Sequence, residues 1–243
     1  MKEITEFETK VPVPPTGMLK EVLNKFGTLG HDKHFFIYNK EDVYLKDEHD
    51  DIGYNNKILR VRSVESISFN IRYANKILTD DRIGYLEEND IVLFLSSFNN
   101  SNNEFKTKSY LTAKLKSVEN GYENNIEREV SISDNNESIN ELFDVLGFRR
   151  KFLKRKFSIS YELEFEPFNV EIVYVSKDRY DKNGVWYVEI ETTKELQERM
   201  GTRLIWNADE YKNRICNIFQ HLGLDPSTKD NRNWKDILGI ESE

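Results

Sequence analysis

The sequence predicts an α+β protein made mostly of antiparallel strands. Much of the chain alternates apolar and polar residues, which is the period of a half-buried strand. Two Asn-Gly pairs, Asn120-Gly121 and Asn183-Gly184, each stand between alternating segments, and this is the strongest short-range signal for a β-hairpin. Three other segments repeat apolar residues at helical spacing. Strands therefore dominate, and helices lie between groups of strands.

The elements of the first half are expected in the following order. A strand over Lys2–Val13 ends where prolines interrupt the alternation. Thr16 is placed to cap a helix whose apolar stripe runs from Met18 to Phe26, with Gly27 closing it. Short strands are then expected at 35–38, 43–45 and 57–64. The segment 63–109 is expected to be an insertion, with strands at 66–73 and 90–98 and a polar loop tip at Asn99–Asn103.

The second half contains the two hairpins and two more helices. The hairpins pair a strand at 110–118 with one at 126–132, and a strand at 170–176 with one at 185–192. Ser138 begins a helix that stops at Gly147, and Asn207 begins one that stops at Gly223.

Composition limits the class of protein. Of 243 residues 12% are aromatic, which is enough for a folded core. The 35 Lys and Arg residues against 43 Asp and Glu residues give a formal charge of −8, which argues against binding double-stranded nucleic acid or an anionic membrane by net charge. No apolar stretch reaches the roughly 18 residues of a membrane span and the first residues form no apolar signal region, so a cytoplasmic location is expected. Pro and Gly are sparse, so residues 1–243 are expected to form a single domain that includes the insertion.

Like-charged residues two apart recur inside the predicted strands, where such side chains project from one face. The pairs are Glu6 and Glu8, Arg60 and Arg62, Lys114 and Lys116, Glu127 and Glu129, Lys154 and Lys156, and Glu189 and Glu191, with Lys10 two residues after Glu8. Chance placement gives roughly eight acidic and five basic pairs at this composition, so the count decides nothing. Each pair alone fits a solvated strand face. Their alternation along the chain, strand after strand, is more informative.

A barrel with these faces turned inward would bring both sets of charges into one lumen. Dry and unpaired, such an interior would be unstable. It becomes reasonable when it is water-filled, the carboxylates hold a hard divalent cation and the basic residues hold a polyphosphate. The single cysteine and four scattered histidines offer no zinc spacing, so oxygen ligands are expected for any metal.

The ordered motifs resemble those of the CYTH superfamily, the triphosphate tunnel metalloenzymes. Glu6-Phe7-Glu8-Thr9-Lys10 is similar to its N-terminal ExExK signature. The later motifs follow in the same order: Ile58–Arg62, Tyr110–Lys116, Glu127–Val130, Leu146–Phe148, Lys151–Lys156 and Val188–Glu191. The tail, with Leu222-Gly223-Leu224 and then Asn233–Leu238, resembles the ending of class IV adenylyl cyclases within that superfamily.

The resemblance implies a fold and a set of roles. The fold would be a closed eight-stranded antiparallel barrel with helices outside, and the insertion would lie at one mouth. The implied cofactor is Mg²⁺ or Mn²⁺, held by Glu6, Glu8, Glu129, Glu189 and Glu191. The implied catalytic residues are Lys10 and Glu127, and the residues implied to bind substrate are Lys10, Arg60, Arg62, Lys114, Lys116, Lys154 and Lys156.

Three features depart from the family pattern. The basic run has Lys154 and Lys156 where the family has KxR, and a one-residue slip would turn Arg155 inward instead. Val173–Ser176 has no acid where many members carry an aspartate. The segment between Arg62 and Tyr110 is longer than usual, and we expect it to cover one tunnel mouth and select the substrate.

The predicted function is metal-dependent hydrolysis of a nucleoside triphosphate or inorganic tripolyphosphate. The tail favours a class IV adenylyl cyclase as the alternative, which would make cyclic AMP and pyrophosphate from ATP. A tunnel that binds nucleotide or polyphosphate without turnover, and a β-protein whose charges merely face solvent, stay open. A homodimer is compatible with the sequence, and no membrane partner is expected.

Overall fold

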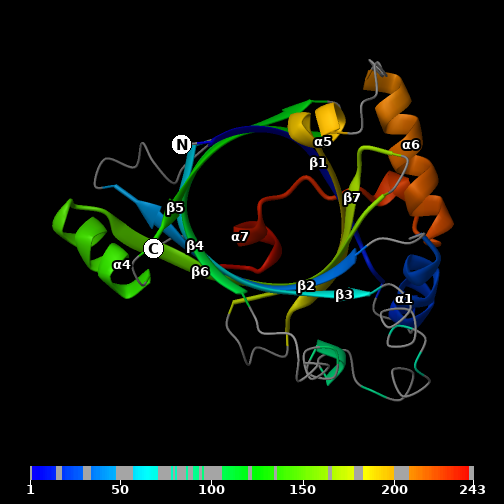
Figure 1. The fold of residues 1–243 in the computed structure, drawn as a ribbon, viewed down its shortest axis with the longest axis horizontal. Helices are drawn as coiled ribbons and strands as arrows, with labels where there is room; N and C mark the ends of the chain where they lie inside the picture. The colour runs from blue at the N-terminus through cyan, green and yellow to red at the C-terminus, as the bar shows by residue number, and fades with distance from the viewer. Residues whose placement is uncertain are drawn as a thin grey trace.

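The computed structural model describes residues 2–14, 18–29, 34–47, 57–70, 78, 80, 86, 90–92, 95, 106–119, 122–133, 136–163, 166–177, 183–199 and 208–240. Within them, eight strands close into an antiparallel barrel in the order β1-β5-β4-β3-β2-β6-β7-β8. The strands are β1 (Lys2–Pro12), β2 (His34–Lys46), β3 (Lys57–Asn70), β4 (Lys106–Glu119), β5 (Tyr122–Ile132), β6 (Arg149–Glu162), β7 (Asn169–Ser176) and β8 (Val185–Thr193). Figure 1 looks down the axis of this barrel, whose strands form a closed ring around a central lumen. The α+β fold class and the closed eight-stranded barrel are confirmed.

The main apolar core lies outside the barrel rather than within it. Helices α1 (Met18–Leu29) and α6 (Ala208–His221) pack side by side on the outer surface, beyond β1, β7 and β2 (Figure 1). Phe26 of α1 and Phe219 of α6 are fully buried there against outward-facing strand residues such as Ile190 and Tyr161. Helix α4 (Asn136–Val145) covers a smaller cluster around Phe143 on the opposite side. The apolar side chains that form these two clusters therefore point outward, and most of the inner face is left to polar side chains.

The C-terminal segment is the exception, because it packs inside one mouth of the barrel. The short η2 (Pro226–Thr228) leads to α7 (Trp234–Ile237), which Figure 1 shows within the ring. Leu238 and Trp234 pack on the inner apolar residues Val173, Val175 and Tyr187. The Tyr187 hydroxyl donates to Asp230 at 2.7 Å, which fixes the start of this segment.

Several sequence predictions need correction. The two short strands expected at 35–38 and 43–45 are parts of one strand, β2, and β3 continues past residue 64 to Asn70. The strand expected at 90–98 is wrong where the structure describes it, since residues 90–92 and 95 are helical. Helix α1 runs through Gly27 to Leu29. Gly147 and Gly223, with φ of 85° and 81°, follow the ends of α4 and α6 as expected.

Both predicted hairpins are present as antiparallel pairs, β4 with β5 and β7 with β8. The bulk of the predicted insertion, including Asn99–Asn103, lies outside the described residues; β3 ends at Asn70 and β4 begins at Lys106. No helix in the described parts of the chain is long and apolar enough to cross a membrane.

Candidate active site

Inward-facing charges form a cavity of about 280 Å³ at the α7 end of the barrel. The strand alternation that buries Val11 outside turns Glu6, Glu8 and Lys10 inward on β1. The neighbouring strands contribute in the same way. The charged lining is Glu6, Glu8, Lys10, Lys40, Arg60, Arg62, Lys114, Lys116, Glu123, Glu127, Lys151, Lys154, Lys156, Glu189, Glu191, Lys235 and Asp236.

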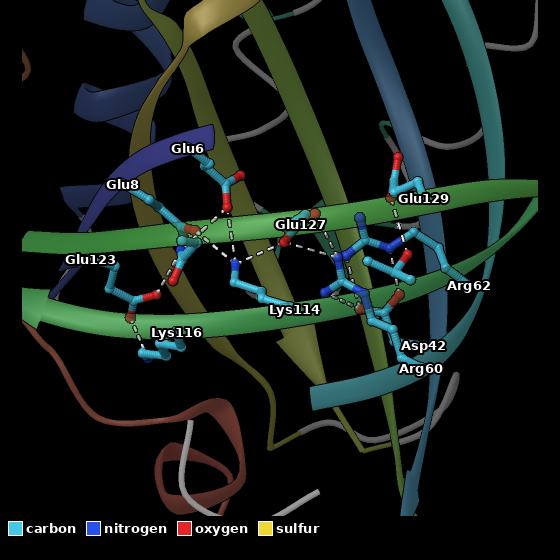
Figure 2. Close-up of polar contacts among 12 residues, drawn as sticks. Glu6, Glu8, Asp42, Arg60, Arg62, Lys114, Lys116, Glu123, Glu127 and Glu129 are labelled. Carbon is cyan, nitrogen blue, oxygen red and sulfur yellow. Dashed lines mark hydrogen bonds and ion pairs between the residues drawn. The ribbon is translucent and has the colours of Figure 1, made fainter. Parts of the chain in front are cut away.

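Lys114 lies at the centre of the carboxylate group. Its Nζ is 2.9 Å from Glu6 Oε2, 2.9 Å from Glu127 Oε1 and 3.7 Å from Glu8 Oε2. Figure 2 shows the three carboxylates converging on this ammonium. Burial lowers the pKa of Lys114, but Glu6, Glu127 and Glu8 together outweigh burial and hold the pKa well above its usual range. Lys114 therefore stays charged.

Asp42 gathers three cations on the adjoining wall, and Figure 2 shows two of them, Arg60 and Arg62. Arg62 donates to both oxygens of Asp42, at 2.6 and 3.1 Å, while Lys154 Nζ is 3.0 Å and Arg60 Nη1 3.6 Å from Oδ2. The Asp42 side chain is 1% exposed. Burial raises its pKa, yet Arg62, Lys154 and Arg60 hold it well below the usual range. This carboxylate fixes three groups that could grip phosphate.

A further carboxylate, Glu123, holds two lysines. Glu123 Oε1 accepts from Lys116 at 2.6 Å and from Lys10 at 3.2 Å. Lys116 also donates to Asn233 Oδ1 at 3.0 Å, and Lys10 lies 5.3 Å from the ring centre of Trp234, so the C-terminal segment touches this group of cations.

The third wall is centred on Lys156, which pairs with Glu189 and, at 2.8 Å, with Glu171 Oε2. Lys40 Nζ lies 3.2 Å from Glu171 Oε1. Burial raises the pKa of Glu171, and the charges of Lys156 and Lys40 outweigh it and hold the pKa below its usual range.

Two inner carboxylates, Glu8 and Glu191, have too little compensating charge: burial and the Glu6 and Glu171 carboxylates raise the pKa of Glu191 well above its usual range. Burial also raises the pKa of Glu8, the Glu189 carboxylate raises it further, and the opposing effect of Lys114 is too small, so the pKa of Glu8 is about 7. Glu189 Oε1 is buried without a hydrogen-bond partner in the described chain. These carboxylates suit an additional cation.

The residues present fit a hard divalent ion of the Mg²⁺ or Mn²⁺ type. Among the described residues no three Asp, Glu, His or Cys side chains are close enough to hold an ion as they stand, and lysine ammoniums lie between the carboxylates. Such an ion nevertheless requires carboxylate oxygens, which the cavity supplies. Glu8 lies near the like charge of Glu189, and Glu189 Oε1 has no hydrogen-bond partner among the described residues, so a cation would relieve both. Glu6, Glu8 and Glu189 are the side chains that would supply oxygen ligands to such an ion.

The structure brings all but one of the predicted site residues into this cavity. Lys154 and Lys156 both point inward, whereas Arg155 points outward and pairs with Glu41, which settles the register. Glu129 is the residue placed elsewhere: it accepts from Thr112 at 3.1 Å and lines a second cavity farther along the lumen. Figure 2 shows it at the far end of the row from Glu8.

Sequence reasoning missed Lys40, Asp42, Glu123 and Glu171. Strand alternation could have found Glu123, four residues before Glu127 on β5. Lys40, Asp42 and Glu171 are recognised only from the register, which pairs them with Lys156, Arg62 and Glu189. Val173–Ser176 contains no acid, and Val173 and Val175 pack against the C-terminal segment instead. The acid that faces inward on β7 is Glu171.

A closed antiparallel barrel with a charged lumen and an external core defines the class of tunnel folds. Comparison with family models gives no match, and neither does comparison with curated proteins. Solved structures do match. A Pyrococcus horikoshii protein is 19% identical with a TM-score of 0.57, and 96% of this chain and 97% of that chain are covered.

Two further solved structures bear names that mention an activity. A Vibrio parahaemolyticus protein named as a proposed adenylate cyclase is 13% identical, with a TM-score of 0.58 and coverage of 97% and 98%. A Hippeastrum protein, named as a proposed adenylyl cyclase with a dominant triphosphatase activity, is 12% identical, with a TM-score of 0.52 and coverage of 97% and 95%. These likenesses establish the fold expected from the CYTH resemblance over nearly the whole chain.

Proposed function

We propose that this protein is a divalent-metal-dependent enzyme that hydrolyses a triphosphate in the cavity at the α7 end. The observation that supports it best is that two oppositely charged sets of side chains line one cavity. One set is the acids Glu6, Glu8 and Glu189, and the other is the inward-facing Lys and Arg side chains. A polyphosphate needs the cations, and a metal that bridges its oxygens needs the acids.

The cations would bind the phosphate chain from two sides. Arg60, Arg62 and Lys154 share Asp42 on one wall, and Lys10 and Lys116 share Glu123 on another. Each group is held by a buried carboxylate before substrate arrives, so little ordering is needed on binding. Lys10, two residues from Glu8 on β1, is proposed to lie beside the reacting phosphate.

Glu6, Glu8 and Glu189 would hold Mg²⁺ or Mn²⁺, with Glu191 at the border of the site. The ion would supply Lewis-acid stabilisation of charge on the phosphate oxygens. Lys114 has its own part, because its ammonium already joins Glu6 to Glu127 and would keep the carboxylates in place. Glu129 stays a proposed ligand only for a cation in the second cavity.

Glu127 is proposed to position cations rather than to accept a proton. Its oxygens are 2.9 Å from Lys114 and 3.4 Å from Arg60. Burial raises its pKa, but Arg60, Lys114 and Arg62 outweigh burial and hold the pKa below its usual range. An ionised carboxylate of this kind is a weak base at neutral pH.

A class IV adenylyl cyclase is the second candidate. The observation that favours it is that the tail which resembles those cyclases reaches the cavity, where Asn233 and Trp234 contact Lys116 and Lys10. The same cations and metal would then promote attack by a ribose hydroxyl in place of water. A cytoplasmic location, where nucleoside triphosphates are made and used, is part of either proposal.

A phosphorus NMR time course separates the candidates. The purified protein is incubated with ATP or with tripolyphosphate, with Mg²⁺ or Mn²⁺, and Glu6→Gln/Glu8→Gln is the matched control. We expect orthophosphate to appear and to be lost in the control. Pyrophosphate with a cyclic monophosphate would instead identify a cyclase, and ligand binding without any product would leave a binding module.

A further inference from the structure

A second cavity, of about 300 Å³, adjoins the proposed triphosphate cavity within the same lumen. Lys40, Arg62 and Glu191 line both cavities, so the two are continuous. It lies toward the end of the barrel where β3 finishes and β4 begins, away from the C-terminal segment. Its lining is Tyr38, Lys40, Arg62, Val64, Tyr110, Glu129, Glu162, Asn169, Glu171, Glu191 and Leu196.

The two cavities differ in the sign of their charge. Among the described residues, ten Lys and Arg side chains and seven acids line the first, whereas two Lys and Arg side chains and four acids line the second. Both cations of the second are already engaged, Arg62 with Asp42 and Lys40 with Glu171. A phosphate chain is therefore drawn to the first cavity and repelled from the second.

The second cavity also has aromatic side chains in its lining. Tyr38 of β2 and Tyr110 of β4 both line it, and Tyr38 is stacked on Phe36 with ring centres 5.8 Å apart.

The remaining polar groups are acceptors held in place. Asn169 donates to Glu191 Oε1 at 2.9 Å, and Ser160 donates to Asn169 at 2.6 Å. Burial and the Glu6 and Glu171 carboxylates raise the pKa of Glu191 well above its usual range, so the acceptors of the cavity are chiefly the oxygens of its other three acids, Glu129, Glu162 and Glu171. The cavity therefore combines π faces with a surplus of acceptors, which suits a flat ring with N–H groups at its edge.

We propose that the second cavity binds the organic end of the substrate, a planar amino-bearing base joined to the triphosphate. This inference rests on the proposed function, because it assumes that the triphosphate occupies the first cavity. It selects nucleoside triphosphates with an exocyclic amino group over inorganic tripolyphosphate, which has nothing to place among the carboxylates.

Equilibrium binding tests this inference separately from turnover. Dissociation constants of ATP, purine riboside triphosphate and tripolyphosphate are measured by calorimetry in EDTA. Purine riboside triphosphate lacks only the amino group of ATP. We expect ATP to bind at least about tenfold more tightly than either of the others, because a hydrogen bond to a charged acceptor is lost in both.

Two variants locate the effect. Glu162→Gln removes one carboxylate of the second cavity and should lower the ATP preference at least about threefold. Arg128→Gln, on the exposed outer face of β5, should leave the preference unchanged. ATP and purine riboside triphosphate of equal affinity in the wild type would overturn the inference, whether or not the protein turns over a triphosphate. Absence of any phosphate product in the NMR experiment would instead overturn the proposed function.

Discussion

Ile190 and its neighbours Glu189 and Glu191 lie on one strand and face opposite ways. Ile190 is fully buried in the external core, and Glu189 is 4% exposed in the lumen. Burial is nearly the same for both, yet its physical meaning differs. Removing Ile190 from water stabilises the fold. Removing Glu189 from water costs free energy that its ion pair with Lys156 opposes, and its Oε1 has no hydrogen-bond partner among the described residues.

The difference teaches which face of each strand serves the fold and which serves the ligand. The outer face supplies the apolar burial that holds the barrel closed. The inner face carries charges in near balance, which a protein selected for stability alone would replace by apolar residues. Inner-face substitutions should therefore alter binding and turnover more than stability, and outer-face substitutions the reverse.

Asp42→Asn should break this rule most strongly. Asp42 is an inner residue, but its loss leaves Arg60, Arg62 and Lys154 buried without their shared counter-charge. Breaking such a network costs about 3–5 kcal/mol. We expect that loss in the free energy of unfolding, measured by urea denaturation.

The same variant has an internal control. Tripolyphosphate can replace the missing negative charge, so millimolar tripolyphosphate should restore more of the melting temperature in Asp42→Asn than it adds to the wild type. Equal shifts in the two proteins would mean that these cations do not meet phosphate.

Ile190→Ala is the outer-face test. It removes a fully buried side chain from the core beneath α1 and α6, and we expect the free energy of unfolding to fall by about 3 kcal/mol. Turnover per folded molecule should stay within about twofold of the wild type. A large loss of turnover in protein shown to be folded would mean that the two faces are not independent.

Glu189→Gln is the matched inner-face test, one residue away. It keeps the shape of the side chain and removes a proposed metal ligand, so turnover should fall at least about 100-fold. The melting temperature without metal should stay within about 3 °C, because Lys156 keeps its pair with Glu171. Metal-dependent stabilisation should shrink with turnover; its survival at full size would remove Glu189 from the metal site.

The inner and outer faces of the strands also explain which parts of the fold and site could be predicted from the sequence. The period of two placed Glu6, Glu8, Arg60 and Arg62 on inner faces because apolar residues between them mark the outer face. Periodicity could not show that the ends of the sheet meet, since closure depends on pairing β1 with β8, and the resemblance supplied it. Periodicity also could not show that Glu127 and Glu129 line different cavities. Both side chains face inward, and what separates the two cavities is their position along the tunnel.

The isolated charges were the harder case. Asp42 follows Glu41, and only the register of β2 shows that Asp42 faces Arg62 while Glu41 faces outward toward Arg155. Residues 90–98 alternate well enough to resemble a strand, yet the described part is helical, because local alternation is weak where tertiary packing decides.

The pH dependence of metal binding gives the smallest expected effect. Glu8 has a pKa of about 7 in the metal-free fold, above its ordinary value of 4.5, so the folded state holds this proton more tightly than the unfolded state. The stability of the metal-free protein should therefore decline as pH rises from 4.5 through 7, as far as Glu8 determines it. A divalent ion needs the ionised form, so its apparent affinity should rise about fivefold from pH 6 to pH 7 and level off above pH 8.

Titration of Mn²⁺ into the protein at several pH values measures this slope, and Glu8→Gln is the control that should flatten it. Asp42, Glu127 and Glu171 cannot produce the same slope, because their pKa values lie below the usual range and they stay ionised throughout. A slope that persists in Glu8→Gln would assign the proton to another group and remove Glu8 from the proposed ligands. A slope that disappears would tie metal binding to Glu8, which with Glu191 is one of two inner carboxylates that the cations of the tunnel leave under-compensated.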